Sequence, residues 1–136
     1  MESLKKYLEN RDWKEFESFI SEVLENFGYK VERNVRLKFM RNKEFDIIAI
    51  KQNRMLIIEC KRWKKEYSKF KNIKKEIEKF KKKVEEYKKY RFIDKKIYPI
   101  FLLLNSSFTP SILDDVYVLS LDFLNSFLLD LENLYI

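Results

Sequence analysis

Two consecutive segments of the chain read as β-strands, and each carries an acidic side chain that could bind a metal ion. Residues 44–50 and 55–61 are rich in Ile and are separated by a short polar break. A loop of two or four residues places Asp46 directly opposite Glu59, whereas a three-residue loop does not. Carboxylates opposed in this way have Cβ atoms about 4.5–5.5 Å apart and repel each other. A divalent cation bound between them would remove the repulsion.

These carboxylates and a neighbouring amine suit metal-assisted hydrolysis of a phosphodiester. Mg²⁺ is held by one or two carboxylates together with substrate phosphates, and we expect Mn²⁺ to substitute for it. Lys61 shares a strand face with Glu59, with Cys60 on the opposite face, and its amine can orient an attacking water and offset phosphate charge. The alternative is an ordinary charged strand edge. Both faces of each strand are apolar, and strict alternation predicts Phe45, Ile47 and Ala49 on one face of the first strand and Ile48 and Ile50 on the other. This favours the metal site, because charge is not buried without a partner.

The other segments predict the elements that position these side chains. A helix is expected from about Asp12 to a left-handed Gly28, and a longer one from about Ser68 to Tyr90. Further predicted elements are short helices at 3–9 and after Thr109, strands at 29–33, 35–41, 97–104 and 116–119, a turn at 105–108 and a final helix from Ser120. The order predicts one α/β domain over residues 1–136, with a mixed sheet and helices on both faces.

Glu17 lies at the border of the apolar stripe of the first long helix. It comes four residues after Trp13 and three before Ile20, so it faces the edge of the core and not the solvated side. A glutamate at this border can reach the metal site, as a ligand or through a bound water. The alternative is that its carboxylate extends outward to solvent.

The charge of the chain is unevenly distributed. Residues 1–96 carry +12 and residues 97–136 carry −5, which together make the net charge of +7. A basic body favours a polyanionic partner, with nucleic acid first and an acidic membrane surface second. Two basic segments near the predicted site could contact phosphates, although both could also be plain solvated surface: Arg36, Lys38 and Arg41 in one, and Arg62, Lys64 and Lys65 in the other.

Composition excludes several classes of site. The chain has no His and a single Cys, which excludes His-based catalysis, His-ligated zinc and an intramolecular disulfide. The N-terminus lacks the apolar run of a signal peptide and no segment reads as a membrane span, so we expect a cytoplasmic protein without a membrane role. The apolar C-terminal segment is larger than one small sheet needs. It predicts either a homodimer contact or a purely intramolecular core.

Over nearly its full length, the chain resembles the PD-(D/E)xK nuclease superfamily, especially Mrr-like restriction endonucleases and archaeal Holliday junction resolvases. The resemblance is carried by Phe16-Glu17, Phe27-Gly28-Tyr29-Lys30-Val31, Phe45-Asp46-Ile47-Ile48-Ala49 and Ile58-Glu59-Cys60-Lys61-Arg62-Trp63, with Phe108-Thr109 resembling the Mrr type. It implies a restriction-endonuclease-like fold in which Asp46 and Glu59 hold the metal. It also implies that Lys61 serves the attacking water and that Glu17 completes the site.

Two departures from the family pattern affect the expected subfamily. Asn42-Lys43-Glu44-Phe45 replaces the Gly-rich or Pro-containing segment that usually precedes the aspartate, and no Gln follows Lys61 in the next helix. Glu44 could act as an accessory acid. We expect a Mg²⁺-dependent DNA endonuclease of restriction or structure-specific type. The alternative is a nucleic-acid-binding module that keeps the nuclease fold without turnover, and metal binding at Asp46 and Glu59 distinguishes the two.

Overall fold

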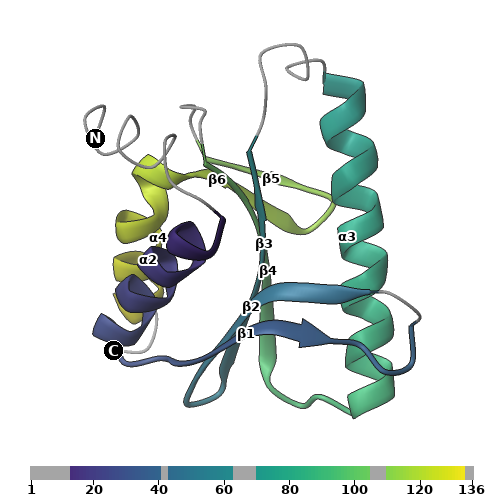
Figure 1. Cartoon of the computed structure of the whole chain (residues 1–136), viewed down its shortest axis with the longest axis horizontal. Coiled ribbons are helices and arrows are strands. Elements are labelled where there is room, and N and C mark those ends of the chain that lie inside the picture. Colours follow the sequence, from purple (N-terminus) through teal and green to yellow (C-terminus); the bar gives the residue numbers. More distant parts are fainter. Residues whose placement is uncertain (1–12, 41–42, 63–69, 105–109, 134–136) are drawn as a thin grey trace.

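A computed structural model describes residues 13–40, 43–62, 70–104 and 110–133. Within these ranges, six strands form one mixed sheet that lies between helices on both faces (Figure 1). The helices are α2 (Trp13–Asn26), α3 (Phe70–Arg91) and α4 (Leu124–Asn133), the last preceded by a 3₁₀ turn at Leu121–Phe123. The strands are β1 (Lys30–Arg36), β2 (Glu44–Lys51), β3 (Arg54–Lys61), β4 (Lys96–Leu103), β5 (Ser111–Leu113) and β6 (Val116–Ser120). The predicted α/β, restriction-endonuclease-like architecture is confirmed.

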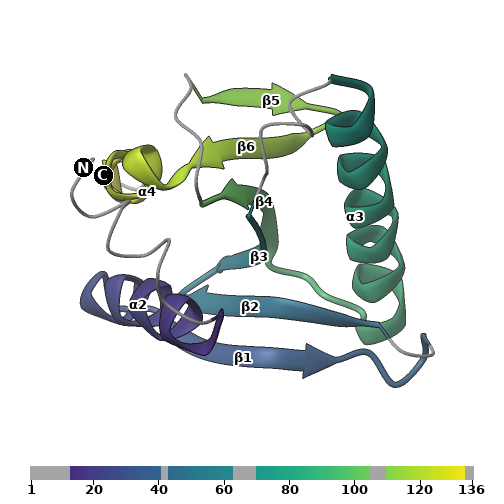
Figure 2. The ribbon, with the colours of Figure 1, turned by 45° about the horizontal axis from the view of Figure 1, so that its top comes forward.

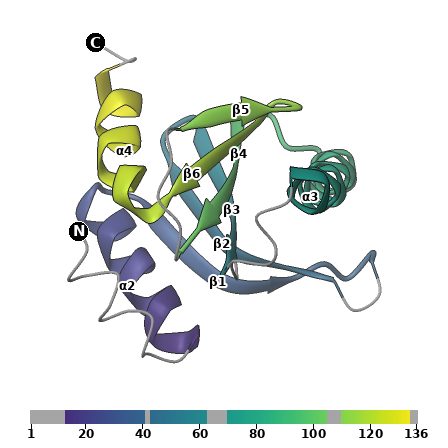
Figure 3. The ribbon, with the colours of Figure 1, turned by 90° about the horizontal axis from the view of Figure 1, so that it is seen from above.

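The sheet has the order β1-β2-β3-β4-β6-β5 (Figure 2). Its first three strands are antiparallel, β4 runs parallel to β3 and to β6, and β5 returns antiparallel to β6. Helix α3 lies on the crossover from β3 to the parallel β4, as such a connection requires. Viewed from above, α3 covers one face alone, and α2 and α4 cover the other (Figure 3). None of the described helices is long and apolar enough to span a bilayer.

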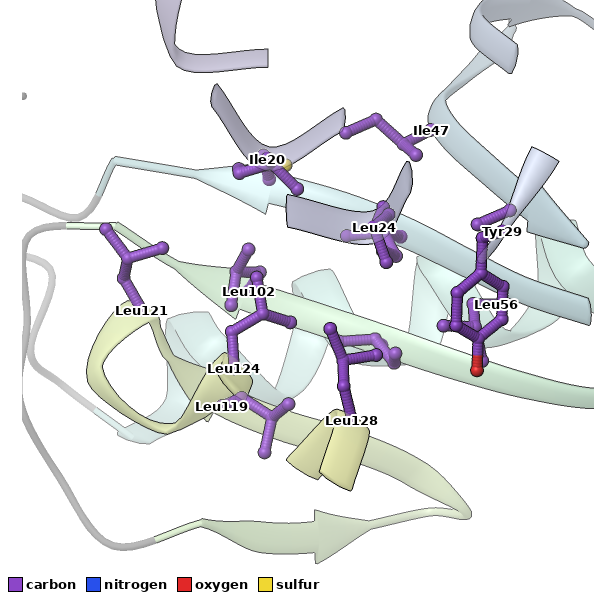
Figure 4. Close-up of a cluster of buried hydrophobic side chains, with 14 of the residues drawn as sticks. Ile20, Leu24, Tyr29, Ile47, Leu56, Leu102, Leu119, Leu121, Leu124 and Leu128 are labelled. Atoms are coloured by element: carbon purple, nitrogen blue, oxygen red, sulfur yellow. The ribbon is translucent and has the colours of Figure 1, made fainter. Parts of the chain in front are cut away.

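The core on the α2 and α4 side is mainly aliphatic. Ile20 and Leu24 of α2 meet Ile47 and Leu56 of the sheet, and Leu128 of α4 closes the same cluster (Figure 4). All five side chains are fully buried. This packing explains the apolar stripe that the sequence places on the first long helix.

The core on the α3 side is built around aromatic rings. Phe80 of α3 packs edge-on against Phe45, with ring centroids 6.3 Å apart, and lies 6.3 Å from Phe101 of β4. Tyr87, two turns along α3, also meets Phe45 edge-on at 5.3 Å. The position of Phe45 corrects the alternation expected from sequence, because this side chain lies on the α3 face with Ile48 and not on the other face with Ile47.

The hairpin between β2 and β3 has the register that the sequence predicts. Lys51 pairs with Arg54, so the loop is the two-residue Gln52-Asn53, and Ile47 pairs with Ile58. Gln52 has φ 54°, the left-handed conformation that tight hairpin turns require.

Gly28 ends α2 in the left-handed conformation, as predicted, with φ 92°. The amides of Gly28 and Tyr29 donate to the carbonyls of Glu25 and Leu24 at 2.9 and 3.1 Å, which is the Schellman pattern. A Cβ atom at residue 28 would lie 3.3 Å from the Lys51 Nζ. The end of α2 therefore needs the positive φ that glycine adopts without strain, and a Cβ atom there would also crowd the end of the Lys51 side chain.

The Gly28→Ala variant should lose about 1–2 kcal/mol in the free energy of unfolding, because alanine is strained at positive φ. Urea denaturation of both proteins measures the difference. The exposed Glu22→Ala change in the same helix is the control and should stay within about 0.5 kcal/mol of wild type. Equal midpoints for the glycine variant and wild type would contradict the expectation.

Two predicted elements are wrong. The helix expected after Thr109 is instead strand β5, because Asp114 and Asp115 have φ 54° and 65° and make a tight turn that pairs β5 with β6. The strand expected over 35–41 ends at Arg36, where the chain turns and Leu37 enters the α3-side core. The predicted helix at 3–9, the helix start at Ser68 and the turn at 105–108 lie outside the described residues.

Candidate active site

Asp46 lies where β2 loses regular pairing with both neighbouring strands. On the β1 side, Arg33 pairs with Ile47 and Val35 pairs with Phe45, but Asn34 and Asp46 between them do not pair. Asn34 has φ 53°. The register with β3 stops at Ile47, and one further step places Asp46 opposite Glu59. The carboxylate of Asp46 is directed towards β3, where its Oδ2 accepts a 2.8 Å hydrogen bond from the Cys60 amide. This interruption of the sheet leaves an acidic side chain at the end of the hairpin.

Glu59 shares the site with Asp46, and the two carboxylates repel each other. Burial, followed by the negative charge of Asp46, raises the pKa of Glu59 from 4.5 to about 7, although the positive charges of Lys83 and Lys61 oppose the increase. Burial, with the charges of Asp46, Glu59 and Glu17, also raises the pKa of the Cys60 thiol. The charges of all three carboxylates therefore act on Cys60, next to the last residue of β3.

The raised pKa of Glu59 predicts a pH-dependent stability in metal-free protein. The folded chain keeps a proton on Glu59 up to about pH 7, whereas the ordinary pKa is 4.5, so this group's contribution is most favourable below pH 4.5 and is lost as pH rises to about 7. The Glu59→Gln variant should gain stability relative to wild type across this window. Urea midpoints measured through the window test this, with the exposed Glu25→Gln as the control. Parallel pH curves for Glu59→Gln and wild type would contradict it.

Lys61 and Glu59 each contact an oppositely charged residue of α3. The Lys83 Nζ lies 3.2 Å from the Glu59 Oε2, and the Lys61 Nζ lies 3.9 Å from the Glu76 Oε2. Glu76 and Lys83 are seven residues apart and therefore share a helix face. Glu59 and Lys61 of β3 therefore each face a residue of opposite charge on α3.

A groove of about 470 Å³ opens over these ion pairs. Glu59 and Lys61 line it together with Glu76 and Glu86. Positive charge predominates among its described lining residues, which include Lys43, Lys61, Lys79, Lys82 and Lys83. A groove rich in lysines beside the Glu59 carboxylate can hold a phosphate backbone near a bound cation.

Glu17 approaches the end of β3 from the α2 side. Its side chain is 2% exposed, so the alternative of an outward-facing carboxylate is wrong. Its Oε1 accepts a 3.4 Å hydrogen bond from the Asn34 Nδ2 and lies 3.9 Å from an Arg33 nitrogen. Asn34 thus links Glu17 to the position where β2 loses its pairing.

The predicted nucleic-acid-binding residues are not all at the groove. Arg36 and Lys38 are exposed and line a separate cavity of about 430 Å³ beside Tyr87 and Tyr90. Arg62 is exposed, and its guanidinium lies 5.4 Å from the centre of the Phe16 ring. Arg41, Lys64 and Lys65 lie outside the described residues. Glu44, suggested as an accessory acid, has an exposed side chain, and its backbone carbonyl accepts a hydrogen bond from Lys83.

Two residues of the site, Lys83 and Glu76, are missed by reasoning from the motif alone. Both are one residue away from buried positions of α3, Val84 and Ile77, but Lys79 is equally close to the buried Phe80 and is 77% exposed. Adjacency to a buried position in the sequence therefore does not single them out.

The donor set fits a divalent cation held by two carboxylates. Asp46 and Glu59 lie close enough for the charge of one to raise the pKa of the other, and a cation would relieve this repulsion. Within the described part of the chain, no group of three or more His, Cys, Asp or Glu side chains is arranged to hold a metal ion. Two carboxylates with added waters and phosphate oxygens are a set that suits Mg²⁺. The role predicted for Glu17 stays a prediction.

Comparison with known protein families agrees with this geometry. The family model described as restriction endonuclease, of the Mrr catalytic type, matches residues 8–111. No significant match was found among the curated proteins or among the solved structures. The match extends from the segment before α2 to the start of β5 and includes Glu17, Asp46, Glu59 and Lys61. The chain therefore belongs to the Mrr-type restriction endonuclease family.

Proposed function

We propose that this protein is a Mg²⁺-dependent endonuclease that hydrolyses phosphodiester bonds in DNA. The observation that carries the proposal is the meeting of Asp46 and Glu59 at the open end of the hairpin, beside Lys61 and under a basic groove. Membership of the restriction endonuclease family supports it.

The proposed reaction assigns a separate role to each side chain. Asp46 and Glu59 hold the cation, and Glu17 supports the site from the α2 side. When bound, a divalent cation stabilises negative charge on the phosphate and acidifies water. Lys61 orients the attacking water and offsets charge on a phosphate oxygen. The lysines of the groove hold the DNA backbone, so binding should weaken as salt increases.

A cleavage assay tests the proposal directly. The protein is incubated with a panel of linear, nicked, flapped and four-way-junction DNAs, with Mg²⁺, with Mn²⁺ or with EDTA. We expect metal-dependent cleavage of at least one DNA and none with EDTA. Cleavage that persists in EDTA, or no cleavage of any DNA with either metal, would contradict the proposal.

A nucleic-acid-binding module without turnover is the second candidate. The ion pairs Glu59–Lys83 and Lys61–Glu76 favour it, because they give both motif side chains a structural role that needs no metal. Calorimetry with Mn²⁺ separates the candidates. The nuclease should bind the ion in wild type and lose it in Glu59→Gln, whereas the module should bind no ion in either protein.

We also propose that the protein is cytoplasmic and that it forms a homodimer through its apolar C-terminal segment. Ile112 and Leu129 are 61% and 54% exposed, and a cavity of about 350 Å³ beside Ile112 is lined by Tyr117 and Phe127. Light scattering should report a dimer for wild type and a monomer for Leu129→Glu. A wild-type monomer at all concentrations would contradict the dimer.

A further inference from the structure

We propose that the ammonium group of Lys83 competes with a divalent cation for the Glu59 carboxylate and, once displaced, contacts the DNA backbone. Lys83 would then be a positioning residue of the site, supplied by α3 and absent from the strand motif. This inference rests on the proposed nuclease function, and its experiment separates the two.

Lys83 is held at the site by contacts from two strands. Its Nζ donates to the Glu59 Oε2 at 3.2 Å and to the Glu44 carbonyl at 2.8 Å, and it lies 5.0 Å from the centre of the Phe45 ring. Its side chain is only 13% exposed, whereas Lys79, one turn earlier, is 77% exposed. Lys83 is therefore not one of the solvated lysines of α3.

The contact with Glu59 places Lys83 in competition with a metal ion. A divalent cation needs lone pairs of the same carboxylate, and an ammonium group at hydrogen-bond distance already uses one of them. The two positive charges also repel each other when both lie against one carboxylate. A cation that binds Glu59 should therefore weaken or displace the Lys83 contact.

A displaced Lys83 remains next to the path of DNA. It lines the same groove as Lys43, Lys79 and Lys82, and its four-carbon stem is flexible. The neighbouring Lys61–Glu76 pair is longer, at 3.9 Å, and leaves Lys61 38% exposed to the groove. When a cation binds, Lys83 would thus lose its contact with the Glu59 carboxylate and gain a contact with a DNA phosphate. Metal binding and DNA binding would then be coupled through this one side chain.

The metal arm of the experiment uses Mn²⁺ calorimetry on DNA-free protein. At about pH 8.5, above the pKa of about 7 at Glu59, Lys83→Met should bind Mn²⁺ roughly tenfold more tightly than wild type, because a competing charge is gone. Lys83→Arg keeps the charge and Lys79→Met lies outside the contact, so both should stay within about twofold of wild type.

The DNA arm compares Lys61→Met with the double variant Lys61→Met/Lys83→Met, since both keep the two carboxylates and neither should cleave. With saturating Mn²⁺, loss of Lys83 should weaken duplex binding about three- to tenfold and reduce the salt slope by about one. With EDTA, Lys83 stays on Glu59 and its loss should change binding less than about twofold. Lys79→Met should weaken binding equally in both conditions.

Tighter Mn²⁺ binding together with weaker DNA binding is a pair of changes that a misfolded variant cannot produce. The inference is overturned if Lys83→Met binds Mn²⁺ no better than wild type, or if DNA binding falls equally with Mn²⁺ and EDTA. If wild type cleaves no DNA but Lys83→Met gains Mn²⁺ affinity, the nuclease function fails and the competition stands. If neither protein binds Mn²⁺, both fail.

Discussion

Replacing Asp46 with Asn is expected to abolish DNA cleavage, lowering kcat by about 10³-fold or more, because the charge that holds the cation and stabilises the transition state is lost. Asn preserves an oxygen that can accept the 2.8 Å hydrogen bond from the Cys60 amide, so the fold of the hairpin should be retained. DNA binding should change by less than about threefold, since the contacts to phosphate come from the lysines of the groove. Initial rates on a cleaved DNA and a binding titration measure the two quantities.

Lys61→Met should give the same loss of cleavage by a different route, because it removes the group that orients water but leaves both carboxylates in place. Asp130→Asn on the exposed face of α4 and Lys75→Met, at an exposed lysine of α3 that does not line the groove, are the matched controls, and both should keep kcat within about threefold of wild type. Cleavage at the wild-type rate by Asp46→Asn or by Lys61→Met would show that the nuclease assignment is wrong.

Phe80→Ala is expected to destabilise the protein by about 3–5 kcal/mol, because truncation leaves a cavity in a core that cannot fully close around it. The ring is 2% exposed and lies between Phe45 of β2 and Phe101 of β4. It also lies between Glu76 and Lys83 along α3, so its loss should loosen both ion pairs to β3. Urea denaturation gives the change in stability.

The control for Phe80 is the same substitution at Phe92, whose ring is 90% exposed. Phe92→Ala should stay within about 0.5 kcal/mol of wild type. Phe80→Leu removes less volume and should cost less than Phe80→Ala, because the cavity that it leaves is smaller. If Phe80→Ala and Phe92→Ala cost the same, α3 is not anchored to the sheet by the aromatic cluster.

Much of the fold could be predicted because its signals are local. The apolar spacing of α2 and α3, the single Gly28 and the polar break at Gln52-Asn53 each act within a few residues, and each prediction is confirmed. The error at Thr109 has a local cause as well. A Thr-Pro pair is a good helix start, but the following turn at Asp114 and Asp115 directs the chain back along β6.

The face predicted for Phe45 from the alternation of side chains is wrong, and the reason lies outside β2. Asn34 of β1 takes a left-handed conformation, and the pairing of β2 with both neighbours is interrupted at Asp46. Phe45 then faces α3, where Phe80 and Tyr87 surround it. Side chains alternate strictly between the two faces of a strand only where the strand pairs regularly with its neighbours. The pairing of β2 is not regular at Asp46.

The sequence by itself determined that two neighbouring strands each carry an acidic residue, with Lys61 two positions after Glu59, and it placed Asp46 opposite Glu59 only for a loop of two or four residues. The structure has the two-residue loop Gln52-Asn53, which gives that register. The partners of that site come from elements far along the chain, so only the tertiary structure decided them. Lys83 lies 24 residues after Glu59, and no local pattern specifies which of the many lysines of α3 faces the sheet. The packing of Phe80 and Tyr87 against Phe45 selects it by fixing the rotation of the helix.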